Sequence, residues 1–295
     1  MKQTLFATTA ILISAMSAEA ADMDGPLVGG FTDSGASYEE ASPAVASPVV
    51  GYVEGELHAG KTSESDLDSK GWALRGAVNF DTGTGLNLQA DGGYGQTDVD
   101  DADYDNTYGA AHVYYRPTQD YALGAFFQSS RLGTGFASSG LSVGSGDVTD
   151  NSGGIEAAYF DVLGTAYTQL GYGKSEWIGV DADHYFGKIG SRLYLTDNMR
   201  IDGEVGLHNF DFDVADANLD LTTASIIGNY RPDAMPFTVF AGYRFDRASL
   251  EISGIDFEPE KSHTLVTGLR YNFASSTLKQ EERSGPAWTT TTILP

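Results

Sequence analysis

Charged side chains recur at every second position along several short segments of this chain, which is the spacing of residues on one face of a β-strand. Acidic and arginine side chains facing each other across a narrow wet space create a transverse field, which orders water and sorts solutes. The same residues could instead pair with one another and close that space. The pattern therefore favours a channel and leaves a packed interior as the alternative; the residues concerned are Glu54, Glu56, Arg75, Asp91, Arg116, Glu156, Arg192, Asp202, Glu204, Arg244 and Arg270.

The histidines do not form a recognisable catalytic set. His58, His112 and His208 share the face of those charges, whereas His184 and His263 are expected in or beside loops. No His-x-Ser pair and no nucleophile–base–orienter arrangement accompanies them. Walker, HExxH and Cys/His metal spacings are also absent from the sequence. We expect a protein that is not an enzyme and that needs no cofactor.

One acidic run alternates as calcium loops do. It extends from Asp98 to Asp105, but it lacks the glycine at the sixth position and the closing glutamate of an EF-hand loop. We expect a solvated acidic loop and no dedicated metal site.

The elements that would position the charged face are strands of about ten residues with strict apolar–polar alternation, which is typical of a transmembrane β-barrel. The opposite, apolar face carries no charge, as in Trp72, Leu74, Val78 and Phe80. The sequence predicts an all-β fold, a single antiparallel transmembrane barrel of about twelve strands. The predicted strands cover 49–59, 70–80, 85–95, 106–116, 120–130, 151–161, 165–173, 187–196, 200–209, 219–230, 237–246 and 263–273.

The connections between these strands alternate strictly between short and long. Short turns on one rim and longer loops on the other are typical of barrels with a periplasmic and an extracellular side. The short connections are 81–84, 117–119, 162–164, 197–199 and 231–236, and the long ones are 60–69, 96–105, 131–150, 174–186, 210–218 and 247–262.

The last predicted strand contains Gly268-x-x-Tyr271-x-Phe273. This resembles the assembly signal of Gram-negative outer-membrane proteins, and the chain is similar to the outer-membrane β-barrel and porin-like superfamily as a class. The resemblance implies insertion by the barrel-assembly machinery. It departs from the usual pattern because about twenty polar residues follow Phe273. By position alone, loop 131–150 resembles the loop that porins fold inward as a constriction; a mobile outer loop is an equal alternative.

Four regions are expected along the chain. Residues 1–20 read as a signal peptide, with Lys2, a short apolar run and a small-x-small site at Ala18-Glu-Ala20. Residues 21–48 are expected to form a flexible leader, 49–273 the barrel, and 274–295 a polar C-terminal tail. This arrangement places the protein in a bacterial outer membrane.

The charge balance limits the kinds of partner that the protein is expected to bind. Formal net charge is −24, from 17 Lys and Arg against 41 Asp and Glu, and the chain has no cysteine. Nucleic-acid binding is excluded because phosphate contacts need clustered basic residues. We expect contact with outer-membrane lipid and lipopolysaccharide, weak divalent-cation bridging at acidic loops, and passage of small hydrophilic solutes with a mild preference for cations. The alternatives are a closed structural barrel and, less favoured, a barrel lipid hydrolase; the oligomeric state is left open.

Overall fold

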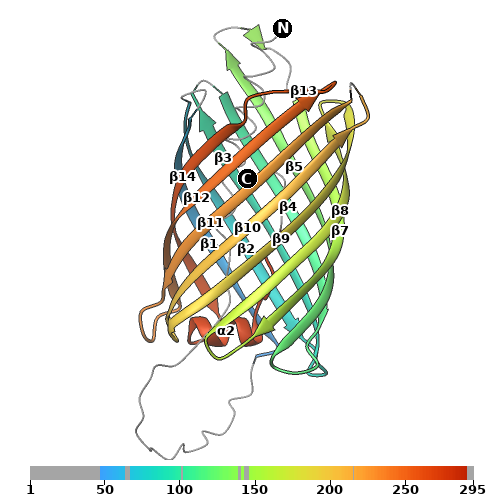
Figure 1. The fold of residues 1–295 in the computed structure, drawn as a ribbon. Helices are drawn as coiled ribbons and strands as arrows, with labels where there is room; N and C mark the ends of the chain where they lie inside the picture. The colour runs from blue at the N-terminus through green and yellow to red at the C-terminus, as the bar shows by residue number, and fades with distance from the viewer. Residues whose placement is uncertain are drawn as a thin grey trace, which may run out of the picture.

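The computed structural model describes residues 47–63, 67–100, 102–138, 141–142, 146–214 and 216–290. Within these ranges twelve long antiparallel strands close into one barrel, as predicted (Figure 1). They are β1 (Val49–Thr62), β2 (Asp68–Asp81), β3 (Leu86–Val99), β4 (Ala102–Tyr115), β5 (Tyr121–Ser138), β7 (Gly146–Phe160), β8 (Gly164–Trp177), β9 (Val180–Thr196), β10 (Met199–Phe212), β11 (Ala217–Tyr230), β12 (Phe237–Ile252) and β14 (Glu260–Phe273). Two-residue strands, β6 (Leu141–Ser142) and β13 (Ile255–Asp256), extend outer connections.

The barrel closes between its first and last long strands. β1 pairs with β14 from Gly51 opposite Phe273 to Thr62 opposite Ser262. On its other side β1 pairs with β2, and each further long strand pairs with two neighbours. Both ends of the barrel segment therefore lie on the rim with the short turns, as expected of an even number of strands.

The strands extend further than predicted at the long-loop rim because their polarity reverses there. On β10, Val205 and Leu207 point outward and are exposed, while His208 is buried inside. Past this point Asp211 lies outside and Phe210 is buried inside. Outward apolar residues suit lipid and outward charged residues suit water, so the reversal marks the upper edge of the lipid-facing belt.

Inward apolar side chains gather at this outer end of the lumen. Trp177 contacts the rings of Phe210 and Phe212 edge-on, with centroids 5.1 and 5.5 Å apart. These contacts belong to a buried set, named here the outer cluster: Val99, Tyr104, Leu132, Val148, Trp177, Ala182, Phe210, Leu219, Leu221 and Ala248.

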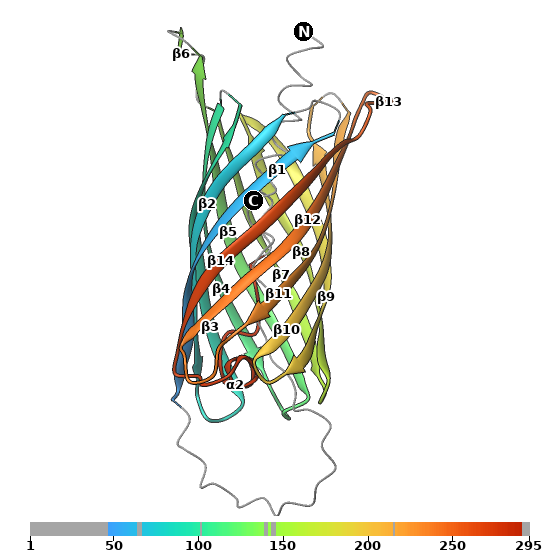
Figure 2. The same ribbon diagram turned by 90° about the vertical axis from the view of Figure 1, so that its left-hand side faces the viewer.

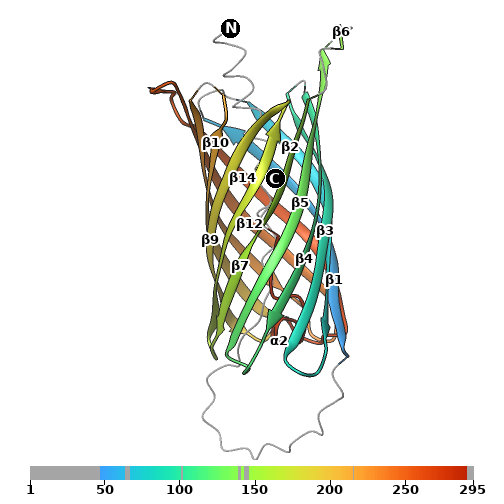
Figure 3. The same cartoon turned by 90° about the vertical axis from the view of Figure 1, so that its right-hand side faces the viewer.

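The longest connection does not fold into the lumen in its described part. Residues 131–138 and 146–150 continue β5 and β7, with Arg131 opposite Thr149 and Thr134 opposite Gly146. Figures 2 and 3 show β5 and β6 rising beyond the rim. The constriction-loop interpretation is therefore wrong for the described residues, because continuous strand pairing carries them outward. Residues 139–140 and 143–145 lie outside the described residues.

After β14 the chain turns back into the barrel. Ala274 has a φ of 62°, a left-handed conformation that reverses the chain direction. Thr277 then caps helix α2 (Leu278–Ser284) by accepting from the Gln280 amide, and α2 lies inside the short-turn rim (Figures 1–3). Among the described residues no helix is long and apolar enough to cross a membrane. The predicted signal peptide 1–20 and leader residues 21–46 lie outside the described residues, as do 291–295.

Candidate functional site: the lumen and its C-terminal segment

The predicted charged residues all reach the inside of the barrel. Eight of the eleven are buried, and Asp91, Arg116 and Glu204 are half-buried. Their inward direction follows from the strand alternation, since the lipid-facing position next to each one is apolar or small. The side chains form separate clusters around the wall.

The first cluster joins β1 to its two neighbours. Glu54 lies opposite both Arg75 and Arg270 in the strand register. Its Oε1 atom is 2.8 Å from Arg75 Nε, and its Oε2 atom accepts from Arg270 Nε at 2.9 Å. Glu56 binds Arg75 and lies 4.0 Å from Arg244 Nη2. Alternating signs on adjacent strands thus produce one connected ion-pair network.

The second cluster is centred on His112 of β4. Its Nε2 atom lies 2.9 Å from Asp91 Oδ1, and its Nδ1 atom lies 3.0 Å from Glu156 Oε2. Gln169 donates to the same Glu156 oxygen at 2.8 Å. A histidine held between two carboxylates has both ring nitrogens occupied, so it is not arranged as a free general base.

His184 corrects the sequence interpretation that placed it in or beside a loop. It is fully buried within β9, facing inward, because β9 begins at Val180 beyond the predicted start. Its Nδ1 atom lies 3.2 Å from Asp150 Oδ1 and its Nε2 atom 3.1 Å from His208 Nδ1. Ser175 donates to Asp150 and not to the histidine, so the group does not form a serine–histidine–aspartate relay. His263 likewise lies within a strand, on the outer face of β14.

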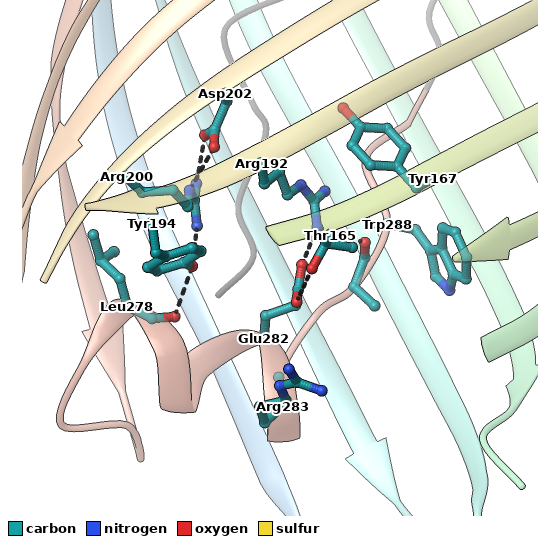
Figure 4. Close-up of polar contacts among 12 residues, drawn as sticks. Thr165, Tyr167, Arg192, Tyr194, Arg200, Asp202, Leu278, Glu282, Arg283 and Trp288 are labelled. Atoms are coloured by element: carbon teal, nitrogen blue, oxygen red, sulfur yellow. Dashed lines mark hydrogen bonds and ion pairs between the residues drawn. The ribbon is translucent and has the colours of Figure 1, made fainter. Parts of the chain in front are cut away.

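The C-terminal segment 277–290, named here the tail, is held inside the lumen by ion pairs from α2. Glu282 accepts from Arg192 Nη1 at 2.7 Å and from Thr165 Oγ1 at 2.8 Å (Figure 4). Glu281 binds Arg231, which follows β11. All of these ionic side chains are buried, so each charge depends on its partner for stabilisation.

Wall side chains also satisfy the carbonyl groups at the end of α2, which no helical partner can reach. Arg116 donates to the carbonyls of Glu282 and Arg283 at 3.0 and 3.1 Å. Arg283 in turn donates to the carbonyls of Gln119 and Asp161 at the short-turn rim. The helix end is thereby fixed to the rim.

Beyond α2 the tail rises along the lumen. Trp288 is 2% exposed and packs edge-on against Tyr114, with centroids 5.7 Å apart. Gln89 accepts from the Trp288 amide and donates to its carbonyl. Lys188 donates to both the carbonyl and the hydroxyl of Thr289. Because Gln89 is on β3 and Lys188 is on β9, the tail contacts well-separated parts of the wall and occupies space within the lumen.

A further network of polar side chains on the wall lies next to the tail. Arg200 forms a two-pronged contact with Asp202, at 2.6 and 2.7 Å, and its Nη1 donates to Tyr194 at 3.1 Å (Figure 4). Tyr194 donates to the carbonyl of Leu278 at 3.3 Å. The wall network is therefore continuous with the first turn of α2.

Burial raises the pKa of Glu282, and the nearby Arg192 guanidinium and Thr165 hydroxyl offset only part of this increase. The ionised carboxylate is thus more costly in the lumen than in water. The protonation of Glu282 and the docking of the tail are therefore linked.

Sequence reasoning missed several lumen residues. Arg200, Lys188 and Asp150 follow the same inward alternation; Arg200 and Lys188 lie in predicted strands, whereas Asp150 lies in the predicted loop 131–150, which β7 replaces from Gly146 onward. The tail residues Glu281, Glu282 and Trp288 fall in the predicted polar C-terminal tail, 274–295. The available signal was that Leu278 and Trp288 flank the acidic pair Glu281 and Glu282, which Arg231 and Arg192 of the wall bind.

No family model matches the sequence, and no curated protein does. The solved structures similar to this chain include the translocator domain of the autotransporter NalP from Neisseria meningitidis, 14% identical, covering 76% of this chain and 88% of that chain with a TM-score of 0.50. They also include a trimer form of OmpT, an outer membrane protein of Vibrio cholerae (10% identical, 76% and 99% covered, TM-score 0.44). An anion-selective porin from Comamonas acidovorans is 9% identical, with 76% and 98% covered and a TM-score of 0.37. At these identities the likeness concerns the fold alone, that of outer-membrane β-barrels.

Proposed function

We propose that this protein is a bacterial outer-membrane channel for passive diffusion of small hydrophilic solutes, with its periplasmic half occupied by its own C-terminal tail. The proposal rests on the outer-membrane barrel fold and on the polarity of the lumen. It treats the tail as a plug that limits conduction.

The observation that carries the proposal is how the lumen is filled. Twelve strands enclose more space than eight, which side chains alone can fill, and less than the sixteen or more of open porins. In the periplasmic half the remaining space is taken by a separate segment, held through polar contacts such as Arg192–Glu282 and Lys188–Thr289. Water can replace such contacts when the segment leaves, exposing a charged wall suited to hydrophilic solutes.

A mild cation preference is part of the proposal. The outer strand ends and loops carry Asp98, Asp103, Asp105, Asp211 and Asp213. A concentration of negative charge at a mouth raises the local concentration of cations, and salt screens the effect.

Planar-bilayer recording of the full-length protein tests this function. We expect brief or small conductance steps from the intact protein, and longer-lived steps from an Arg231→Gln/Trp288→Ala variant that loosens the tail. Reversal potentials should favour potassium over chloride. Heat-modifiable migration on SDS gels controls for an intact barrel. If both folded proteins are silent, the channel is refuted; chloride selectivity would refute the cation preference alone.

A closed structural barrel is the second candidate, favoured by the ion pairing of Glu54 and Glu56 with Arg75 and Arg270. It predicts silence from both proteins in the same recording. We also propose that the protein has no catalytic activity, since His184 is engaged by Asp150 and His208, and the nearby Ser175 hydroxyl donates to Asp150 and not to the histidine. Release of fatty acid from phospholipid vesicles by the purified protein would contradict that proposal.

A further inference from the structure

Two buried arginines at the periplasmic end of the barrel depend on the tail for their counter-charges. Among the described residues, Glu282 is the carboxylate that forms an ion pair with Arg192, and Glu281 is the one that pairs with Arg231. Both arginines are fully buried, and a buried cation that loses its anion is strongly destabilising. When the tail leaves, each of these arginines therefore needs water or another anion in place of the glutamate.

The surroundings of Arg192 form a site for one carboxylate group. Arg192 of β9 lies directly opposite Thr165 of β8 in the strand register. Its guanidinium carbon lies 4.4 Å from the centre of the Tyr167 ring, and this stacking fixes the plane of the group. Arg192 Nη1 donates to Glu282 Oε1 at 2.7 Å, and Thr165 Oγ1 donates to Glu282 Oε2 at 2.8 Å (Figure 4). Two wall donors on neighbouring strands thus contact the two oxygens of one carboxylate.

The tail does not satisfy this site completely. Among the described residues, Nε and Nη2 of Arg192 are buried without a hydrogen-bond partner, and such unpaired donors are costly. Its Nη1 atom is shared between Glu282 and the carbonyl of Ala287, which lies 3.2 Å away. A carboxylate that is free to approach an arginine forms two parallel hydrogen bonds with it. A carboxylate that is not tethered to α2 therefore has more to gain at Arg192 than Glu282 has.

We propose that Arg192 and Thr165 form a binding site for a small carboxylate that enters from the periplasmic rim, competes with Glu282 and releases the tail. In the docked protein, Glu282 stands in for this ligand. The inference deepens the proposed function, because it names what opens the plug, but it requires only a docked tail and not conduction. The ligand enters on the side of the plug, so it does not pass the acidic outer mouth, which repels anions.

A ligand that binds only the released state shifts tail docking by mass action. The ratio of released to docked tail rises by a factor of one plus the ligand concentration divided by its Kd, so ligand at about ten times its Kd raises the ratio about ten-fold. Trypsin cleavage after Lys279 in α2 follows this ratio when docking is fast relative to cleavage. The probe is propionate, because it reproduces the side chain of Glu282 beyond its Cα atom.

The proposal is tested by trypsin cleavage of the full-length protein in detergent, titrated with propionate at constant ionic strength. With propionate at about ten times its Kd we expect cleavage about ten-fold faster, and less than about two-fold faster with propionamide, which has the same shape without the charge. Inorganic phosphate should act more weakly than propionate, because the site matches a planar group of two oxygens. No acceleration by propionate would overturn the site, and equal acceleration by propionamide or phosphate would overturn its assignment to carboxylates.

Arg192→Lys and Arg116→Lys form a matched pair of variants. Each keeps a cation that contacts the tail and removes the guanidinium group, but Arg116 donates to the carbonyls of Glu282 and Arg283 and not to a carboxylate. An ammonium group at position 192 can contact Glu282 once, as Nη1 does, but it cannot form two parallel hydrogen bonds with propionate. We expect the Kd of propionate to rise about ten-fold in Arg192→Lys and less than about two-fold in Arg116→Lys. An unchanged Kd in Arg192→Lys, or equal changes in both variants, would overturn the site. Heat-modifiable migration on SDS gels confirms that each barrel is folded.

Discussion

The two ends of the lumen are filled in different ways. At the outer end, wall residues such as Trp177 and Phe210 pack against each other and make an apolar cluster. At the periplasmic end the wall is charged, and the tail supplies Glu281, Glu282 and Trp288 as partners. One end is thus completed by strands that are part of the barrel, and the other by a segment attached through a single connection.

This difference determines which end of the lumen can open while the barrel stays folded. Removing the outer cluster would expose apolar side chains of the strands themselves, which costs burial energy in every case. Releasing the tail exchanges ion pairs and hydrogen bonds for contacts with water, and the strand ladders stay intact. We therefore expect the periplasmic end to open at a lower free energy than the barrel as a whole.

The largest effect should come from breaking the pair between Arg231 and Glu281. Arg231→Ala leaves a buried carboxylate without its cation, which typically costs about 3–5 kcal/mol. The cost falls on the docked tail, since an undocked tail can hydrate Glu281. We expect trypsin to cleave after Lys279 and Arg283 about 100-fold faster or more at pH 8. Mass spectrometry of the released peptide measures the cleavage rate.

The exposed pair between Lys279 and Asp197 is the control for this measurement. It joins α2 to the rim at 3.3 Å with both partners partly exposed, and such pairs contribute about 0–1 kcal/mol. Asp197→Asn keeps both trypsin sites and should change cleavage only slightly. Similar acceleration in both variants would show that the tail is not held by its buried charges.

A smaller effect, on the other end, should follow from Trp177→Ala. Removing a large buried aromatic costs about 3–5 kcal/mol, and we expect about 3 because Trp177 retains 8% exposure. The lower free energy of unfolding should appear when the barrel is unfolded in urea and monitored by far-UV circular dichroism. Trypsin cleavage of the tail under native conditions should be unchanged. Accelerated cleavage would mean that the two ends are coupled and that the comparison is wrong.

The sequence predicted the barrel well because strand alternation is local. The segment from Trp72 to Phe80 shows its two faces without knowledge of any partner, and the short turns limit the register. Prediction was less successful where the environment changes along a strand. Beyond Leu207 the apolar side turns inward, so the alternation predicts loops for the outer parts of β9 and β10, and His184 falls in one of these predicted loops.

The tail was not predictable in the same way. Its place depends on contacts far apart in sequence, such as Arg192 with Glu282 and Gln89 with Trp288. A short helix with four charged residues among seven has the composition of a solvated extension. Only the three-dimensional arrangement shows that these charges pair with Arg192 and Arg231 inside the barrel.

The smallest expected effect is a pH dependence of tail docking. Burial raises the pKa of Glu282 in the docked state above its ordinary value in an undocked tail. The docked state therefore binds more protons between those two pKa values, so the contribution of Glu282 to docking is fully present at acidic pH and is lost as pH rises through the raised pKa. Docking should be somewhat tighter at pH 5 than at pH 8.

Trp288 reports this change directly. In a Trp72→Phe/Trp177→Phe background it is the one tryptophan of the sequence, and acrylamide quenching measures its exposure. We expect quenching to rise modestly from pH 5 to pH 8, and Glu282→Gln, which cannot ionise but keeps the hydrogen-bonding shape, to flatten that dependence. An unchanged slope in Glu282→Gln would assign the titration to another lumen group. A slope of opposite sign would mean that the ion pair with Arg192 outweighs the burial of the carboxylate, and that ionised Glu282 secures the tail.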